Sequence, residues 1–453
     1  MKTEADQRSP APVLDAARSV PVRPRLAVPY DETSSSPLDL SAALAGRWEI
    51  VWLVEADRPG LGPMARLLPR LGTLVDTAGR SPAQVAESLS DAQLSGVVAF
   101  TDSQLPVAAG VAESLRLEGN PPAVVDALTD KASQRRALEA AGIAVPAHVS
   151  LPAGCSPDEV LALVGRLRYP LVVKPRRGSS SRSVSVVSGP EGLAELFGTR
   201  PEAEPLRHED FLAEEWLVDA EPVVSGLGSY VSVEAMAQRG VIVPLAITGK
   251  FPTAPPCRET GNFMPHLLEP TVAEQVVDLA VRSAAALGVR SGALHVEIKL
   301  TPDGPRVIEI NGRVGGGGID ALYATCHGRS LTEIAARVAL GERLDLQPVS
   351  CDPQDGPFPF AYFTQPPPDA TAIVALSGMD RALELSGVTS ASVNRGPGDR
   401  VDAAAGSQGY VASFRGEAAT VAELAAVPTA IDGVLDIVYQ WPDRHDPGGA
   451  EGA

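Results

Sequence analysis

The chain has 453 residues, 44% of them apolar and 21% charged, a composition typical of a soluble globular protein of roughly two to four domains. Its formal net charge of −18 argues against nucleic acid or an anionic membrane as the main partner, because like charges repel. No apolar run is long enough for a transmembrane helix, and the N-terminus lacks the apolar centre of a signal peptide. The four cysteines lack paired metal spacing, so reduced thiols and a cytoplasmic location are expected.

The N-terminal part alternates strands and helices after a polar stretch over 1–24 that predicts a mobile tail. Apolar runs predict strands over 26–30, 49–54 and 96–101, and helical periodicity predicts helices over 38–44, 64–71, 82–89 and 107–117. This order indicates a parallel, Rossmann-like sheet. The first strand-to-helix turn has no Gly-x-Gly-x-x-Gly, so a dinucleotide site is not expected.

A Gly/Ser/Arg-rich loop over 176–182 follows a predicted helix over 130–141 and a buried-looking strand over 169–175. A second strand is predicted over 183–187. Small residues let backbone N–H groups approach phosphate oxygens, and serine hydroxyls add donors. Together with Lys174 at the strand end, the loop predicts phosphate binding. The alternative is a flexible surface hairpin tip.

The segment after this loop continues with strands predicted over 211–218, 229–237 and 241–248, a long loop over 250–267, and a helix over 272–287. The adjacent carboxylates in the first of these strands could hydrogen-bond the edge of a nucleotide base. The alternative is that they are solvated charges at the edge of a sheet. A Pro/Asp-rich junction over 348–357 precedes a C-terminal region of short strands, and the tail over 442–453 is expected to be disordered.

A hairpin is predicted where two alternating segments flank a Pro/Asp/Gly turn near Asp303. If the hairpin is centred there, Glu297 lies opposite Glu309, and side chains of one parity share a face. The polar face then carries His295, Glu297, Lys299, Glu309, Asn311 and Arg313, and the buried face carries Val296, Ile298, Leu300, Ile308 and Ile310.

Opposed carboxylates destabilise a sheet unless positive charge lies between them. Two carboxylates with the Asn311 amide oxygen form a hard ligand set suited to Mg²⁺ or Mn²⁺ that also holds substrate phosphates. The hairpin therefore predicts a metal site. The alternative is an ordinary amphipathic hairpin whose polar face lies in water.

The order of these motifs resembles the ATP-grasp superfamily of the biotin-carboxylase-like type. The motifs are Asp130-Lys131, Val172-Val-Lys-Pro-Arg-Arg-Gly-Ser-Ser-Ser181, Glu214-Glu-Trp-Leu217, Ser232-Val-Glu234, and the hairpin with His295-Val-Glu-Ile-Lys299 and Val307-Ile-Glu-Ile-Asn-Gly-Arg313. The loop from Ile247 to Asn262 is similar to that of carboxylate–amine ligases, among them L-amino-acid ligases of dipeptide and natural-product (antibiotic) biosynthesis.

The resemblance implies an α/β and α+β multidomain ATP-grasp fold behind an N-terminal Rossmann-like domain. Its implied division is a tail over 1–24, the Rossmann-like domain over 25–120, linker helices and a small lid subdomain over 121–205, a large subdomain with the metal hairpin over 206–347, a C-terminal subdomain over 348–441, and a tail over 442–453.

The resemblance also implies roles for individual residues. Phosphates of ATP would be bound by Lys131 and Lys174 and covered by Gly178, Ser179, Ser180 and Ser181. Adenine would lie against Glu214, Glu215, Trp216 and Leu217, and the metal on Glu297, Glu309 and Asn311. Arg313 would stabilise the acyl phosphate. Tyr230 stands where many relatives have an acidic residue, so the ribose contact is open, with Glu221 as a substitute.

The loop over 250–266 is expected to shape a substrate pocket. Lys250 and Arg258 suit a substrate carboxylate and Glu259 suits an ammonium, whereas the alternative is that these charges are solvated. Cys257 has no sequence-local partner that would make it a nucleophile.

The implied reaction is ATP-dependent joining of a carboxylate, an amino acid in the first instance, to an amine. An acyl phosphate would form and be aminolysed, with ADP and phosphate released. The rivals are ATP-dependent carboxylation of the biotin-carboxylase or purine-pathway type and a non-catalytic nucleotide-binding protein of the same fold. Relatives of this kind are commonly homodimers.

Overall fold

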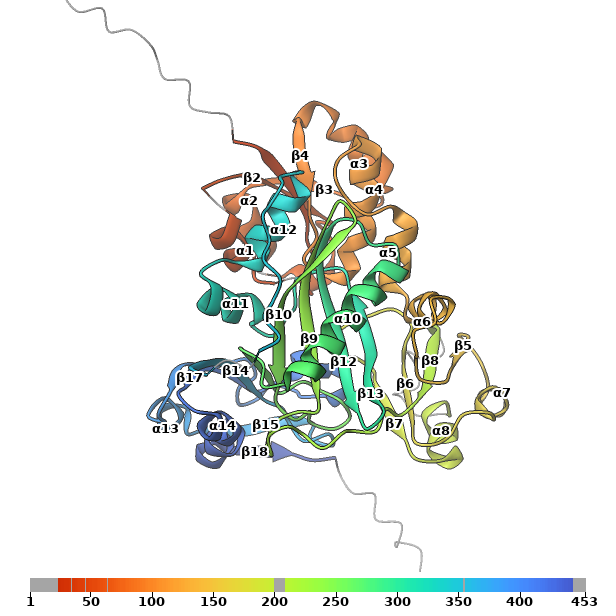
Figure 1. Cartoon of the computed structure of the whole chain (residues 1–453), viewed down its shortest axis with the longest axis vertical. Coiled ribbons are helices and arrows are strands. Elements are labelled where there is room, and N and C mark those ends of the chain that lie inside the picture. The colour runs from red at the N-terminus through yellow and green to blue at the C-terminus, as the bar shows by residue number, and fades with distance from the viewer. Residues whose placement is uncertain are drawn as a thin grey trace, which may run out of the picture.

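The computed structural model describes residues 23–442 except for 34, 45, 63, 199–207 and 353–354. The predicted tails over 1–24 and 442–453 lie almost wholly outside these residues. Figure 1 shows the N-terminal sheet at the top, a long central sheet below it, and a small sheet and the C-terminal region at the two lower sides.

The N-terminal region is a four-stranded parallel sheet in the order β3-β2-β1-β4, which confirms the Rossmann-like prediction. Its strands are β1 (Arg25–Pro29), β2 (Glu49–Val54), β3 (Thr73–Asp76) and β4 (Leu94–Val97), and its helices are α1 (Pro37–Leu44), α2 (Met64–Leu71), α3 (Pro82–Ser88) and α4 (Leu105–Leu115). The strand β3 was not predicted, because four residues with no fully buried side chain carry no periodic signal.

Two helices, α5 (Pro122–Thr129) and α6 (Lys131–Ala140), lead from there into a small antiparallel sheet in the order β5-β8-β6-β7. The Asp130 carboxylate begins α6 by accepting from the N–H groups of Ala132 and Ser133, a standard N-cap. The small sheet consists of β5 (His148–Leu151), β6 (Leu171–Pro175), β7 (Ser185–Val187) and β8 (Phe211–Glu215), with α7 (Pro157–Val164) and α8 (Pro190–Leu196) packed beside it.

The central sheet has eight strands in the order β13-β12-β9-β10-β11-β14-β17-β16. They are β9 (Tyr230–Gln238), β10 (Val241–Lys250), β11 (Gly261–Phe263), β12 (Gly292–Thr301), β13 (Gly304–Asn311), β14 (Phe358–Thr364), β16 (Val388–Val393) and β17 (Ala412–Ala418). After the predicted junction over 348–357, β14, β16 and β17 continue the sheet that holds the hairpin.

Helices cover this sheet on both sides. The helix α10 (Pro270–Ala286) packs on β9, β10, β12 and β13 and buries an apolar layer that includes Val233, Val296 and Ile310 (Figure 1). The other elements are α11 (Ile319–His327), α12 (Leu331–Ala339), α13 (Met379–Leu383), α14 (Val421–Val434), and the two-stranded sheet of β15 (Ala372–Ser377) and β18 (Asp436–Gln440).

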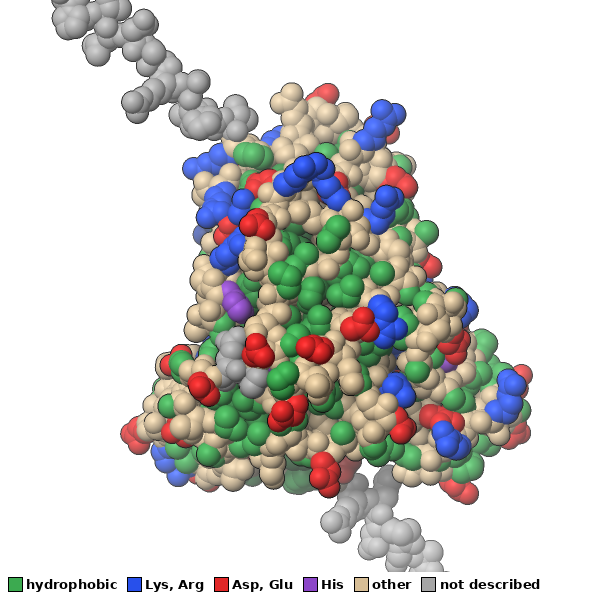
Figure 2. All heavy atoms as spheres, in the orientation of Figure 1, with side chains coloured by type: hydrophobic (Ala, Val, Ile, Leu, Met, Phe, Trp, Pro, Cys, Tyr) green, Lys and Arg blue, Asp and Glu red, His purple; other side chains and the backbone are tan. Residues whose placement is uncertain are grey.

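The surface over α10 carries charges of both signs. Figure 2 shows acidic and basic side chains interspersed there with apolar ones, so the net charge is not gathered into one acidic patch on this face. Among the described residues, no helix has both the length and the apolar character needed to cross a bilayer.

Candidate active site

The side of the central sheet away from α10 carries a row of polar side chains. Strand register brings them together: Glu234 pairs with His295, Ser232 with Glu297 and Tyr230 with Lys299 across β9 and β12. Asn311 and Glu309 continue the same face on β13, and Thr248 extends it on β10. Because paired residues share a face, four strands supply one polar surface (the polar face).

The predicted opposition of the two hairpin carboxylates is confirmed, since Glu297 pairs with Glu309 and His295 with Asn311. Beyond this point the register shifts by one residue, and Ile298 pairs with Val307. The buried position therefore belongs to Val307, which is 0% exposed, whereas Ile308 is only partly buried. The prediction that Ile308 lies in the core was wrong, because a bulge resets the alternation of side chains.

His295 lies between two carboxylates of the polar face. Its Nδ1 is 3.0 Å from both oxygens of Glu234, and its Nε2 is 3.4 Å from Glu297. Burial alone would lower the pKa of His295, but the Glu234 carboxylate raises it to about 9. Burial works against ionisation of Glu297 too, yet the hydrogen bond and charge of His295 bring the pKa of Glu297 to about 2.

Gly315 explains how closely the backbone packs on this pair. A Cβ at that position would lie 2.8 Å from Nδ1 of His295 and 2.9 Å from Glu234, which is too near for any side chain. The backbone after β13 therefore holds the His295–Glu234 pair in place.

Glu309 connects the polar face to the Gly/Ser loop (residues 178–183). The Lys131 ammonium lies 3.0 Å from Glu309 and donates to the carbonyl oxygen of Gly178 at 2.8 Å. Lys131 thus bridges a candidate metal ligand and the candidate phosphate loop, and it is almost fully buried.

Lys174 and Glu214 form a second buried ionic cluster with Arg135. Glu214 accepts from Lys174 at 2.6 Å and from Nε of Arg135 at 2.5 Å. Burial favours the neutral acid, but Arg135 and Lys174 together lower the pKa of Glu214 to about 2. Both oxygens of Glu214 therefore face cations, and the alternative that this carboxylate is a solvated charge is wrong because Glu214 is buried.

Arg135 was missed by the sequence analysis. A signal for it exists, because Lys131 and Arg135 are four residues apart on α6 and so lie on one helix face.

The strand end after β8 carries the other residues expected near adenine. Glu215 accepts from the backbone N–H and guanidinium of Arg168. The Trp216 ring lies 5.9 Å from the Lys299 ammonium, which is the same distance from the Tyr230 ring. Leu217 is partly exposed and Glu221 is exposed.

The loop over residues 250–262 (the Lys250 loop) is held by contacts of its own charges. Lys250 is 1% exposed and pairs with Glu259 at 3.1 Å. Arg258 is also 1% exposed and donates to the carbonyl oxygens of Pro255 and Pro366. The alternative that Lys250 and Arg258 are solvated is therefore wrong.

Arg313 reaches the N-terminal region. Its Nε donates to the Asp102 carboxylate at 2.7 Å, and Asp102 begins a short 3₁₀ helix just after β4. Asp102 was not among the predicted site residues, although the carboxyl end of a parallel strand is where functional side chains gather. Arg313 thereby ties the hairpin to the Rossmann-like sheet.

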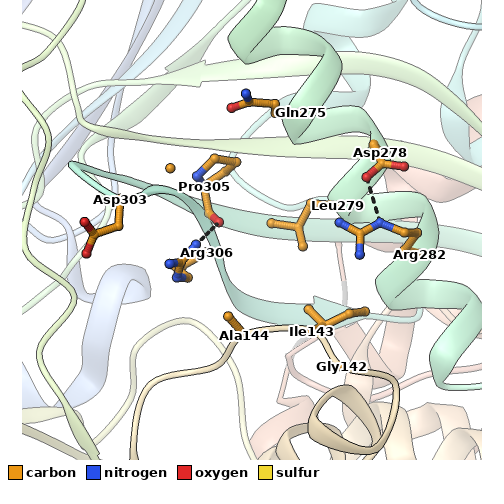
Figure 3. Close-up of a pocket in the computed structure, with 11 residues that line it drawn as sticks. Gly142, Ile143, Ala144, Gln275, Asp278, Leu279, Arg282, Asp303, Pro305 and Arg306 are labelled. Carbon is orange, nitrogen blue, oxygen red and sulfur yellow. Dashed lines mark hydrogen bonds and ion pairs between the residues drawn. The ribbon is translucent and has the colours of Figure 1, made fainter.

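A cavity of about 590 Å³ lies elsewhere, between α10, residues 142–144 and the hairpin turn. Figure 3 shows Arg282 paired with Asp278 on one side of it and Arg306 near Pro305 on the other. None of the predicted site residues lines this cavity, so it is separate from the polar face.

A divalent metal ion fits the polar face by its donor chemistry. Glu297 and Glu309 offer carboxylates from opposed positions, and Asn311 donates its amide N–H to the carbonyl oxygen of His295, which leaves its oxygen as the acceptor. The described residues contain no group of three or more His, Cys, Asp and Glu arranged for a metal. One or two carboxylates completed by substrate phosphates is the usual Mg²⁺ arrangement.

Part of the chain matches a known domain family. Residues 167–321 match the model of the ATP-grasp domain. The chain is 29% identical over 225 residues to a D-alanine–D-alanine ligase of Cupriavidus necator, covering 48% of this chain and 65% of that enzyme. It is 26% identical over 248 residues to the alanine–anticapsin ligase of Bacillus subtilis, covering 51% and 52%. The chain thus spans about half to two thirds of these relatives' own length.

The fold has solved counterparts across nearly the whole chain. An L-amino acid ligase from Bacillus licheniformis superposes with a TM-score of 0.70 at 20% identity, covering 92% of this chain and 99% of that one. At this identity the likeness shows the fold alone.

Proposed function

We propose that this chain, which contains an ATP-grasp domain, is an ATP-dependent carboxylate–amine ligase with an amino acid among its substrates. The observation that carries the proposal is the polar face, where opposed Glu297 and Glu309 lie beside Lys131 and the Gly/Ser loop. The relatives named as D-alanine–D-alanine ligase and alanine–anticapsin ligase support an amino-acid substrate.

The residues divide into two groups by what they would bind. Lys131, Lys174 and the Gly/Ser loop would hold the phosphates of ATP, and Glu297, Glu309 and Asn311 would hold Mg²⁺, or Mn²⁺ in its place. The bound metal supplies positive charge to the phosphates when ATP is present. Lys131 pairs with Glu309, and Lys174 pairs with Glu214. When ATP binds, each lysine would either leave its carboxylate for a phosphate or contact both groups.

The chemistry runs in two displacements. An oxygen of the substrate carboxylate attacks the γ-phosphorus, the bond to the bridging oxygen breaks, and ADP leaves with the electron pair. The amine nitrogen then attacks the acyl carbon, phosphate leaves with the carboxylate oxygen, and the amine loses a proton. Arg313, held by Asp102, would stabilise the negative charge of the acyl phosphate.

The Lys250 loop would orient the organic substrate. Lys250 and Glu259 present opposite charges 3.1 Å apart, which suits the two ends of an amino acid. Lys250, Arg258 and Tyr230 are buried, and exclusion of water there would protect the acyl phosphate from hydrolysis.

The test is mass spectrometry of the purified protein with ATP, Mg²⁺ and pooled amino acids. ADP, phosphate and a product equal to two substrates minus water are expected. With the carboxylate labelled by ¹⁸O, one labelled oxygen should appear in the released phosphate. Amide formed without that transfer contradicts the acyl-phosphate route.

Replacing the amino acids by bicarbonate distinguishes an ATP-dependent carboxylase from the proposed ligase. ADP that depends on bicarbonate, with no amide in any amino-acid pool, would overturn the ligase in favour of a carboxylase. ATP binding without ADP in either reaction would favour the non-catalytic protein.

A further inference from the structure

The Gly/Ser loop is docked onto a segment of the C-terminal region more than 220 residues away in the sequence. This segment, the η5 segment (Ala403–Gly409), is a 3₁₀ stretch between β16 and β17. The N–H of Ser407 donates to the carbonyl oxygen of Ser180 at 2.7 Å, and the N–H of Ser183 donates to that of Ala404 at 3.0 Å. Two main-chain hydrogen bonds therefore hold the loop against the η5 segment.

The η5 segment also holds the Lys250 loop. The hydroxyl of Ser407 accepts from the N–H of Glu259 at 2.9 Å, and Gln365 donates to the carbonyl oxygens of both Glu259 and Ser407. On the other side, the Ser181 hydroxyl donates to the carbonyl oxygen of Cys257 at 2.8 Å. Ser407 thus contacts both loops at once.

The backbone at this junction is strained. Ser180, Ser181, Ser183 and Cys257 all have positive φ, and they are four of the seven non-glycine residues with that property in the described part of the chain. Such conformations cost free energy and persist only where surrounding contacts enforce them. The docked loop is therefore a state that its contacts maintain.

Gly406 lets the two backbones meet. It has φ +70°, and a Cβ there would lie 2.1 Å from the carbonyl oxygen of Ser180. Neither the conformation nor the space admits another residue without moving the loop.

We infer that Gly406 and Ser407 are positioning residues that latch the Gly/Ser loop closed and couple its closure to the order of the Lys250 loop. The inference rests on the proposed function for what the two loops cover, nucleotide on one side and organic substrate on the other. Closure would then be complete only when both loops are in place, which would limit ATP hydrolysis in the absence of the acceptor.

Limited trypsin digestion of the full chain tests the latch without any activity assay. Arg182 is exposed, and the bond that follows it leads into Ser183, whose N–H is held by Ala404. Gly406→Ala should raise cleavage after Arg182 by about tenfold, because cleavage follows the open population.

Gly398→Ala is the matched control. Gly398 has φ +91° in the same region, and a Cβ there meets nothing within 4 Å. It also replaces a glycine of positive φ but does not touch the loop, so its cleavage after Arg182 should equal that of the wild type. Equal cleavage in the two variants would overturn the latch.

Ser181→Ala serves if Gly406→Ala fails to fold, since it removes only the hydroxyl that donates to Cys257. Cleavage should then rise about threefold, and unchanged cleavage would overturn the role of this contact.

Coupling is tested by ADP released per amide formed, measured with Mg²⁺, ATP and the amino acids that support turnover. Gly406→Ala and Ser407→Ala should both raise this ratio about tenfold relative to Gly398→Ala. A ratio unchanged in both variants would overturn the coupling. Wild-type protein that binds no ATP in calorimetric titration would refute the proposed function instead, while the trypsin comparison would still decide the latch.

Discussion

The polar face and the loop junction differ in how their geometry is determined. On the polar face, Glu234, His295 and Glu297 occupy adjacent strands, and hydrogen-bonded register decides which side chains meet. At the junction, the Gly/Ser loop, the Lys250 loop and the η5 segment meet through a few hydrogen bonds between distant segments. The polar face is held by strand register, whereas the docked loops depend on a few contacts, and regions held by few contacts are expected to open first.

The largest effect is expected from the polar face. Glu309→Gln removes a candidate metal ligand and the carboxylate that faces Lys131, so metal-dependent turnover should fall by about 10³-fold or more. Steady-state ADP release over a range of Mg²⁺ concentrations measures it, with the exposed Glu269→Gln as the control. Near-native turnover in Glu309→Gln would remove the metal assignment.

Lys174→Met tests the second ionic cluster. It removes the cation proposed to hold a phosphate but leaves Arg135 on Glu214, so KM for ATP should rise by about tenfold to a hundredfold. Initial rates over a range of ATP concentrations check this, with the exposed Arg166→Met as a control for loss of a cation. Unchanged KM and kcat would show that Lys174 serves the fold alone.

Acid should destabilise the same cluster. Arg135 and Lys174 overcome the effect of burial and lower the pKa of Glu214 from 4.5 to about 2, so the ion pairs stabilise the fold above the ordinary pKa and are lost as the pH falls toward 2. Unfolding by urea between about pH 6 and about pH 3 should show stability falling with pH. Glu214→Gln should be less stable at pH 6 and show a shallower fall. If the unfolding free energies of the wild type and Glu214→Gln fall in parallel with pH, Glu214 is not the group responsible.

The smallest effects are expected from substitutions at the bulge, where the stability costs at Val307 and Ile308 should differ. Val307→Thr places a hydroxyl in the core and should cost about 1–3 kcal/mol in unfolding free energy. Ile308→Thr, at a partly exposed position, should cost well under half as much. Urea unfolding of both variants gives the comparison, and the reverse order would mean that the register shift is absent in solution.

Regular alternation explains which parts of the site were predictable. The opposition of Glu297 and Glu309 follows from counting residues around a turn, and the strand before Lys174 follows from an apolar run. The bulge at Ile308 was not predictable. The sequence alternates apolar and polar residues in the same way whether or not one residue is left unpaired, so the pattern does not reveal the shift in register. Arg135 and Asp102 were missed because their partners Glu214 and Arg313 lie 79 and 211 residues away.

The sequence by itself determined most of the N-terminal strands and helices, Lys174 at the end of a buried strand and the opposed carboxylates, because each depends on residues near one another in the chain. Only the tertiary structure decided which cation faces which carboxylate and that the η5 segment holds two loops together. Those contacts join segments that share no local pattern, and their strength depends on burial that forms only when the whole fold is complete.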